Sequence, residues 1–221
     1  MKIDFEQIDW EKIWEATYET FYMTIISVAA TFVLGIILGL LLYLTDKDGI
    51  WQNKMLNFIT ATLVNVFRAI PFIILILLLF PFTDFLMGTI RGPKAALPAL
   101  IIGGAPFYGR LVEIALKEVD KGVIEAAQSM GAGVQRIVFR VLLPESMPAL
   151  ISGITVTAIA LIGYTAMAGA IGAGGLGSYA YYTGFQRKQW DIVFVCTIII
   201  VLIVFLFQFI GDTIAKKIDK R

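Results

Sequence analysis

Five long stretches with few or no charged side chains dominate the hydrophobic pattern of the chain. The first has 26 residues, and as an α-helix it would extend about 39 Å, which exceeds the ~30 Å hydrocarbon core of a bilayer. The third is short unless its helix continues past Arg110 and Glu113 with both facing protein or water. The pattern predicts five membrane spans, over residues 20–45, 57–82, 95–116, 147–170 and 192–213.

These spans are predicted to be helices. Lipid offers no hydrogen-bond partners to the backbone, so only helices and closed barrels cross a membrane. Barrel strands alternate in polarity, whereas these runs are continuously apolar. The expected fold class is therefore an all-α membrane protein. Within the first span small residues recur every four positions, which predicts close packing against another helix; they are Ser27, Thr31, Gly35 and Gly39.

Composition narrows the classes of function. Charged residues make up 16% of the 221 residues, against about 25% in soluble proteins. With no histidine and a single cysteine, Cys196, the sequence excludes an ordinary zinc site and a histidine-based active site. A net charge of +1 provides no basic surface for binding nucleic acid.

The two ends of the chain differ in charge. Residues 1–18 are acidic and carry Trp10, Trp14 and Tyr18, which predicts an amphipathic segment at the membrane surface. The connections expected inside hold 11 Lys and Arg and those expected outside hold 6, so the positive-inside rule places the N-terminus outside and the C-terminus in the cytoplasm. The predicted organisation is this segment, a transmembrane domain over 19–215 and a basic cytoplasmic tail over 216–221.

The polar connection over 117–145 has helical patterning. Apolar residues with helical spacing form a stripe comprising Val134, Ile137, Val138, Val141 and Leu142. A shorter helix precedes this stripe, with Asp120 as its expected N-cap. We expect Gly131 and Gly133 to break the chain between the two helices, and Pro144 to limit the second. On the pattern alone, an interfacial hairpin with no partner is an equal alternative.

The same connection carries a motif. Glu125, Ala126 and Ala127 precede Gly131, and Val141-Leu142-Leu143-Pro144 follows after nine residues. This spacing resembles the EAA loop of ABC importer permeases. The resemblance implies a type I importer permease fold, with five transmembrane helices and a cytoplasmic coupling helix between spans three and four that docks on a separate ATPase. The residues it assigns to ATPase coupling are Glu125, Ala126, Ala127, Met130, Gly131, Leu143 and Pro144.

Four further segments, over 65–74, 103–110, 163–177 and 208–212, look like the membrane subunit of methionine importers. This resemblance implies a homodimeric permease for D- or L-methionine in a bacterial plasma membrane, working with two ATPase subunits and an extracytoplasmic substrate-binding protein. No Gly-Lys-Ser or Gly-Lys-Thr occurs in the chain, so it lacks a phosphate-binding loop. We therefore expect it to be no enzyme and to bind no cofactor, with ATP and Mg²⁺ bound by the ATPase.

Four residues are candidates for the translocation pathway: Asn65, Arg68, Tyr164 and Met167. A charged side chain at the bilayer centre costs ~2.5–3.5 kcal/mol, so we expect Arg68 to face the bundle with Glu113 or Asn65 as its partner, or to reach the membrane rim. Tyr164 and Met167 stand out among small residues in span four. Met167 is either a flexible apolar plug or an ordinary packing residue.

Glycines after span four predict a mobile loop at the outer mouth, where a binding protein would dock. They include Gly172, Gly174, Gly175 and Gly177.

Other functions remain open at this point. Permeases for other amino acids or for osmolytes share the same loop. A gradient-driven secondary transporter would need carboxylates within its spans or an inverted repeat, and the sequence shows neither. A membrane-embedded enzyme would need a nucleophile with a base, and the chain has no histidine.

Overall fold

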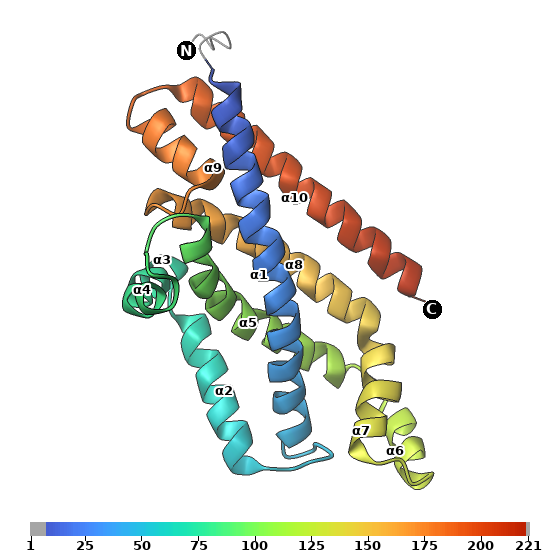
Figure 1. Ribbon diagram of the computed structural model, residues 1–221. Helices are drawn as coiled ribbons and strands as arrows, with labels where there is room; N and C mark the ends of the chain where they lie inside the picture. Colours follow the sequence, from blue (N-terminus) through green and yellow to red (C-terminus); the bar gives the residue numbers. More distant parts are fainter. Residues whose placement is uncertain (1–7, 220–221) are drawn as a thin grey trace.

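The computed structural model describes residues 8–219, and within that part of the chain every regular element is a helix (Figure 1). The expected all-α fold class is confirmed. The elements are α1 (Trp10–Thr45), α2 (Lys54–Ala69), α3 (Phe72–Leu78), α4 (Phe80–Met87), α5 (Pro93–Lys117), α6 (Lys121–Ser129), α7 (Val134–Ile137), the π-helical turn η2 (Val138–Leu142), α8 (Leu143–Ala170), α9 (Gly175–Ser178), the π-helical turn η3 (Tyr179–Phe185) and α10 (Trp190–Ile218).

Helix α5 occupies the middle of the bundle, in contact with both α1 and α8, and α10 packs on α8. The small residues of α1 are buried as expected. A side chain on Gly35 would collide with the Tyr108 ring, and one on Gly39 with Val112 and the Gly109 carbonyl. The small residues therefore allow α1 to lie directly against α5.

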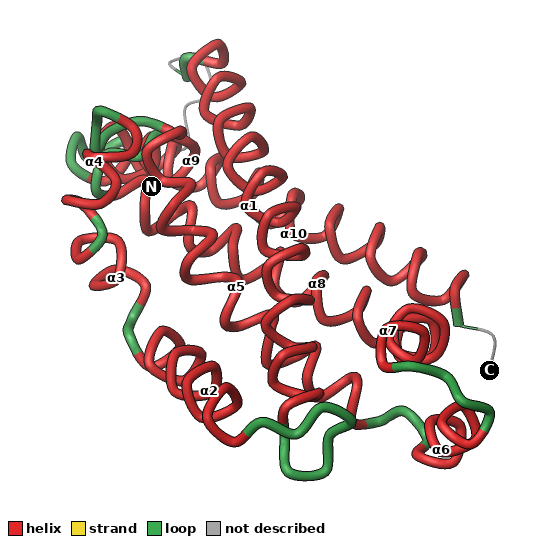
Figure 2. Tube along the Cα trace, turned by 60° about the horizontal axis from the view of Figure 1, so that its bottom comes forward, coloured by secondary structure: helices red, strands yellow, loops and turns green. Residues whose placement is uncertain are grey.

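Two ends of the bundle are distinct (Figure 1). One holds α6, α7 and the turn between α1 and α2, and we call it the α6 end. The other holds α9 and the start of α1, and we call it the α9 end. Helices α2, α3 and α4 follow one another along one side of the bundle (Figure 2).

Helix α1 crosses the predicted boundary between residues 18 and 19. No proline or glycine occurs between Trp10 and Val33, so nothing separates the expected surface segment from the span. The side chain of Asp9 caps the helix by accepting a hydrogen bond from the backbone N–H of Lys12. Residues 1–7 of that segment lie outside the described residues. At the other end, α10 likewise continues through Lys216 and Lys217 of the predicted tail.

The second predicted span, over 57–82, is broken at Pro71. Helices α2 and α3 meet at an angle of 108°. Ile70, which precedes Pro71, is extended, with φ −79° and ψ 123°. A proline disfavours helical geometry in the residue before it and donates no backbone hydrogen bond, so the helix ends there despite the continuous apolar run. Within residues 8–219, four helical segments can cross a membrane by length and composition, or five if α2 and α3 form one span.

Pro144 does not end a helix, contrary to expectation. Segments α7, η2 and α8 run on as one candidate span, Val134–Ala170, and Pro144 lies in the first turn of α8. The N–H of Leu143 donates to the carbonyl of Val138, five residues back. Such a π-type turn inserts one extra residue, and this wider turn accommodates the proline at a position where no N–H is available.

Candidate functional site

Helix α6 has one buried and one exposed face. Asp120 caps it as expected, accepting a hydrogen bond of 2.6 Å from the N–H of Gly122. Ile124 and Ala127 are buried in a hydrophobic cluster with residues of α5, α7 and η2. The remaining residues are exposed to solvent, and they include Val123, Glu125, Ala126 and Met130, the last with 80% of its surface exposed. Helix α6 thus presents small and apolar side chains outward from the end of the bundle.

Gly131 ends this surface with a left-handed turn. Its φ is +78°, a conformation that glycine adopts without steric cost. The N–H of Gly131 donates to Gln128 and that of Ala132 to Ala127, at 2.9 and 3.0 Å, as in a helix C-terminal cap. A Cβ on Gly131 would meet no atom of the described residues within 4 Å. Position 131 therefore favours glycine because of its backbone conformation, since the space beside the residue is open.

The C-terminal part of the motif lies elsewhere. Leu142 is fully buried in the cluster that holds Ile124 and Ala127, and Leu143 packs against that cluster. Pro144 is exposed at the start of α8. These residues support α6 from beneath and connect it to α8, while the residues around Glu125 form the outward face.

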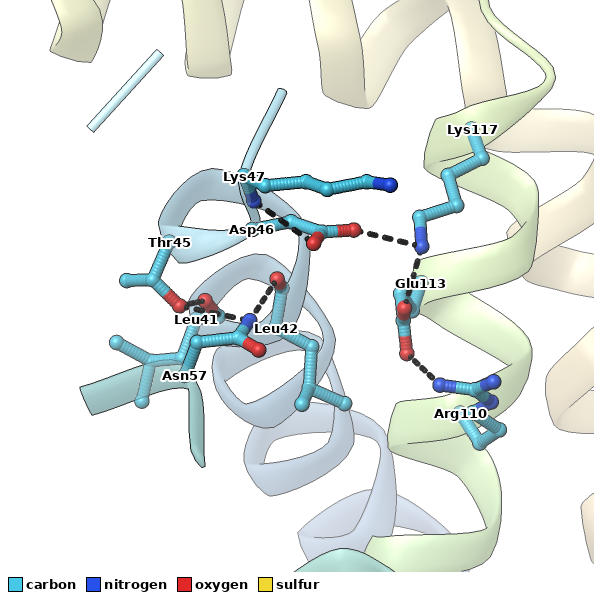
Figure 3. A network of polar contacts seen from close by, with 9 residues as sticks. All are labelled: Leu41, Leu42, Thr45, Asp46, Lys47, Asn57, Arg110, Glu113 and Lys117. Atoms are coloured by element: carbon cyan, nitrogen blue, oxygen red, sulfur yellow. Dashed lines mark hydrogen bonds and ion pairs between the residues drawn. The ribbon is translucent and has the colours of Figure 1, made fainter. Parts of the chain in front are cut away.

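A chain of ion pairs lies beside α6, at the end of α5 (Figure 3). Glu113 is 4% exposed and accepts from Arg110 at 2.6 Å and from Lys117 at 2.8 Å. Lys117 also contacts Asp46, the C-cap residue of α1, at 3.0 Å. Glu113 is therefore not the partner of Arg68, as had been expected. A buried carboxylate needs compensating charge, and here two cations of its own helix supply it.

The Asp46–Lys117 contact joins two segments far apart in the sequence. The hydrogen bond from Lys117 lowers the pKa of the Asp46 carboxyl, and the N–H of Lys47 lowers it further. The two side chains are 32% and 47% exposed, and partly exposed pairs of this kind contribute only about 0–1 kcal/mol to stability. The contact is thus worth little to folding itself. The spacing of Arg110, Glu113 and Lys117 on one helix was readable from the sequence, but Asp46 was not.

A cavity of about 240 Å³ brings together residues of α2, α3, α5 and α8. Arg68 and Tyr164 line it, together with Phe67, Ile70, Phe72, Leu75, Gly103 and Phe107. The Phe72 and Tyr164 rings stack with centroids 4.3 Å apart and planes 2° from parallel. Within residues 8–219, Arg68 has no hydrogen bond or ion pair, so the guanidinium at the cavity remains available. We call this space the central cavity.

Asn65 and Met167 are not among the residues that line the central cavity. Both are exposed, Met167 with 48% of its surface accessible. The structure therefore brings Arg68 and Tyr164 together at one cavity and places Asn65 and Met167 outside its lining.

The glycine-rich stretch, which was expected to form a loop, is a short turn followed by a helix. Gly172, Gly174 and Gly175 have positive φ values, and α9 begins at Gly175. The N–H of Gly175 donates to the Glu19 carboxylate at 2.6 Å. A Cβ on Gly177, inside α9, would collide with the backbone of Ala166. This turn is therefore tied closely to α1 and α8 at the α9 end.

Comparison with known proteins identifies the family. The sequence model of the family described as "Binding-protein-dependent transport system inner membrane component" matches residues 32–221. The chain belongs to this family. Since such permeases are not catalytic themselves, the expectation that this chain is no enzyme is confirmed by its family. The resemblance to ABC importer permeases is likewise confirmed.

Relatives within the family agree with this assignment. The chain is 67% identical over 181 residues to the methionine import system permease protein MetP of Bacillus subtilis (strain 168), covering 82% of each chain. It is 47% identical to the probable D-methionine transport system permease protein MetI of Pasteurella multocida (strain Pm70), covering 82% of this chain and 83% of the relative. Inward-facing conformations of the MetNI methionine ABC transporter include a chain with a TM-score of 0.90 and 43% identity, covering 92% and 94%. The type I importer permease fold is thereby confirmed.

Proposed function

We propose that this chain is the membrane permease of a bacterial methionine importer, acting as a homodimer on two ATPase subunits that bind ATP and Mg²⁺. The 67% identity to a methionine import permease supports the substrate, and an extracytoplasmic binding protein delivers it. The observation that carries the coupling mechanism is the exposed face of α6, which offers Ala126 and Met130 beyond the end of the bundle. Small side chains permit close backbone approach, and methionine adapts to irregular surfaces.

In this proposal the α6 end faces the cytoplasm, and the N-terminus lies outside. Closure of the two ATPases moves the docked α6, and the movement passes through the hydrophobic cluster beneath it to α5 and α8. These helices and α2 line the central cavity, which then opens to the other side. The Gly172–Gly177 region at the α9 end meets the binding protein.

Uptake of labelled methionine tests this function. In bacteria lacking their own methionine importer, the chain expressed with its ATPase and binding protein should restore uptake, and excess unlabelled D- or L-methionine should compete. An unrelated amino acid and an osmolyte serve as controls. Restoration of uptake of the control compounds but not of methionine would assign the permease to a different substrate.

Cross-linking at Met167 tests whether the pathway lies between the two subunits. As an exposed apolar side chain one turn from Tyr164, it is proposed to close the pathway by meeting its counterpart in the second copy. A Met167→Cys variant should form a cross-linked dimer in the resting state. The yield of this cross-linked dimer should fall when ATP is bound before the cross-linker is added. Met55→Cys, at an exposed position of α2 near the α6 end, is the control. Equal cross-linking at both positions would argue against a gate.

A further inference from the structure

Polar contacts between different helices are few at the α6 end. Within residues 8–219, Lys117 of α5 contacts Asp46 at the end of α1. Asn57 of α2 donates to the carbonyl of Leu42 at 2.9 Å and to the hydroxyl of Thr45 at 3.2 Å. Both contacts meet the last turn of α1 from different sides (Figure 3). The end of α1 is thus joined to α5 on one side and to α2 on the other.

Besides its contact with Asp46, Lys117 is held by a residue of its own helix. Its ammonium group contacts the buried Glu113 carboxylate on the same helix, which Arg110 also engages. Helix α6 begins at Lys121, four residues after Lys117, and Val119 between them is buried. The position of this ammonium group is therefore linked to α6 through a short, packed connection.

Apolar contacts also connect α1, α5 and α6. Leu44 of α1 belongs to one hydrophobic cluster with Leu116 and Val119 at the end of α5 and with Ile124 of α6. The buried face of α6 and the last turn of α1 therefore share a core. A displacement of α6 acts on both α5 and α1.

Helix α2 can respond to such a displacement. Only Thr60 and Val64 are buried along its 16 residues, so packing alone constrains it weakly, and the Asn57 contacts hold its first turn to α1. Its last turn contributes Phe67 and Arg68 to the central cavity. A rigid helix held at one end transmits movement of that end to the other.

We propose that the Asp46–Lys117 contact is a positioning link that carries movement of α6 through α1 to α2, and that without it ATP hydrolysis continues while less substrate is moved for each ATP hydrolysed. This inference rests on the proposed coupling function of α6. In this proposal Asp46 and Lys117 act through the helices that they join. The route runs from Lys117 to Asp46, along the last turn of α1 to Asn57, and through α2 to Arg68.

Asp46→Asn is the most selective change. It removes the negative charge at the end of α1 and leaves Glu113 paired with both cations, so no buried charge loses its partner. Asp48→Asn is the matched control, because Asp48 lines the same 340 Å³ cavity as Asp46 and is exposed on the same turn. Asp46→Glu restores the charge and tests rescue.

The experiment uses the complete transporter in lipid vesicles and measures ATP hydrolysis and methionine uptake on the same preparation. For Asp46→Asn we expect at least a fivefold rise in ATP hydrolysed per methionine imported, with the complex intact. Asp48→Asn should match the wild type, and Asp46→Glu should recover most of the coupling. Equal ratios in the two Asn variants, or a parallel loss of hydrolysis and uptake, would overturn the proposal.

A second readout separates this inference from the substrate assignment. Cys196 is buried, so a water-soluble maleimide should label mainly the cysteine of a Phe67→Cys variant. The rate of this labelling reports how accessible the central cavity is to water. Binding of a non-hydrolysable ATP analogue to the complex should change the labelling rate in the Asp48→Asn background and not in the Asp46→Asn background. This result is expected whichever substrate is imported. If both backgrounds respond equally, the link is structural only, even where methionine uptake is confirmed.

Discussion

Replacement of Gly131 by Asp is expected to reduce methionine uptake to less than a tenth of the wild-type rate while the chain still inserts and folds. The φ of +78° is one that Asp tolerates better than most residues, although at some cost. The larger effect is a second negative charge beside the exposed face of α6, close to Glu125. Docking on an ATPase would bury this charge without a partner, which is strongly unfavourable.

Two variants separate the causes of this loss. Gly131→Asn has nearly the same shape as Gly131→Asp without the charge, and Gly133→Asp places the same charge where φ is −70° and the space is open. Uptake, with the amount of assembled complex measured by co-purification of the ATPase, is compared for all three. Loss in both Gly131 variants would show that the added side chain itself prevents docking. Normal uptake by Gly131→Asp would refute the role of this turn.

Replacement of Gly169 by Val should strongly destabilise the α9 end. A Cβ at this position of α8 would meet the backbone of Ser178, Gly174 and Gly177, and backbone atoms cannot move aside as a side chain can. Overpacking costs about 1–3 kcal/mol, and contacts with the Gly174 carbonyl and with the Gly177–Ser178 peptide unit place this site at the upper limit. For a chain of this size, ~3 kcal/mol lowers Tm by roughly 6–12 °C.

The matched control is Gly163→Val in the same helix. Gly163 is exposed, and a Cβ there would meet no atom in the part of the chain that the structure describes. The Tm of this variant should stay within about 2 °C of the wild type, since surface changes are usually worth less than ±0.5 kcal/mol. Thermal unfolding of both variants is followed in the same detergent. Similar Tm values would contradict the close contact between α8 and α9.

The sequence predicted the elements whose apolar runs coincide with whole helices. Spans three and five, the Asp120 cap and the break at Gly131 are of this kind, since local spacing and capping residues determine them. The direction of the bend at Pro71 could not be predicted, because Phe72 and the residues after it continue the apolar pattern. Hydropathy predicts whether a segment lies in an apolar environment, but it does not predict the direction of the helix axis.

The polar contacts of the site were harder to predict. Arg68 was assigned a partner because a buried charge needs one, yet it lies beside the central cavity, where the requirement does not apply. Glu113 was available as that partner in the sequence, but its own helix supplies two cations at helical spacing. The Glu19–Gly175 and Asp46–Lys117 contacts each join distant segments, and such pairs become visible only once the helices are placed.

Helix α1 has a consequence for the surrounding lipid. Its uncharged stretch of 26 residues, over 20–45, extends about 39 Å, beyond a ~30 Å hydrocarbon core. An isolated helix adapts to a thinner bilayer by tilting, but α1 is held against α5 at Gly35 and Gly39 and against the α9 turn at Glu19 and Thr20. Because its inclination is fixed by protein contacts, the acyl chains must stretch or compress around it, and transport should depend on the chain length of the host lipids.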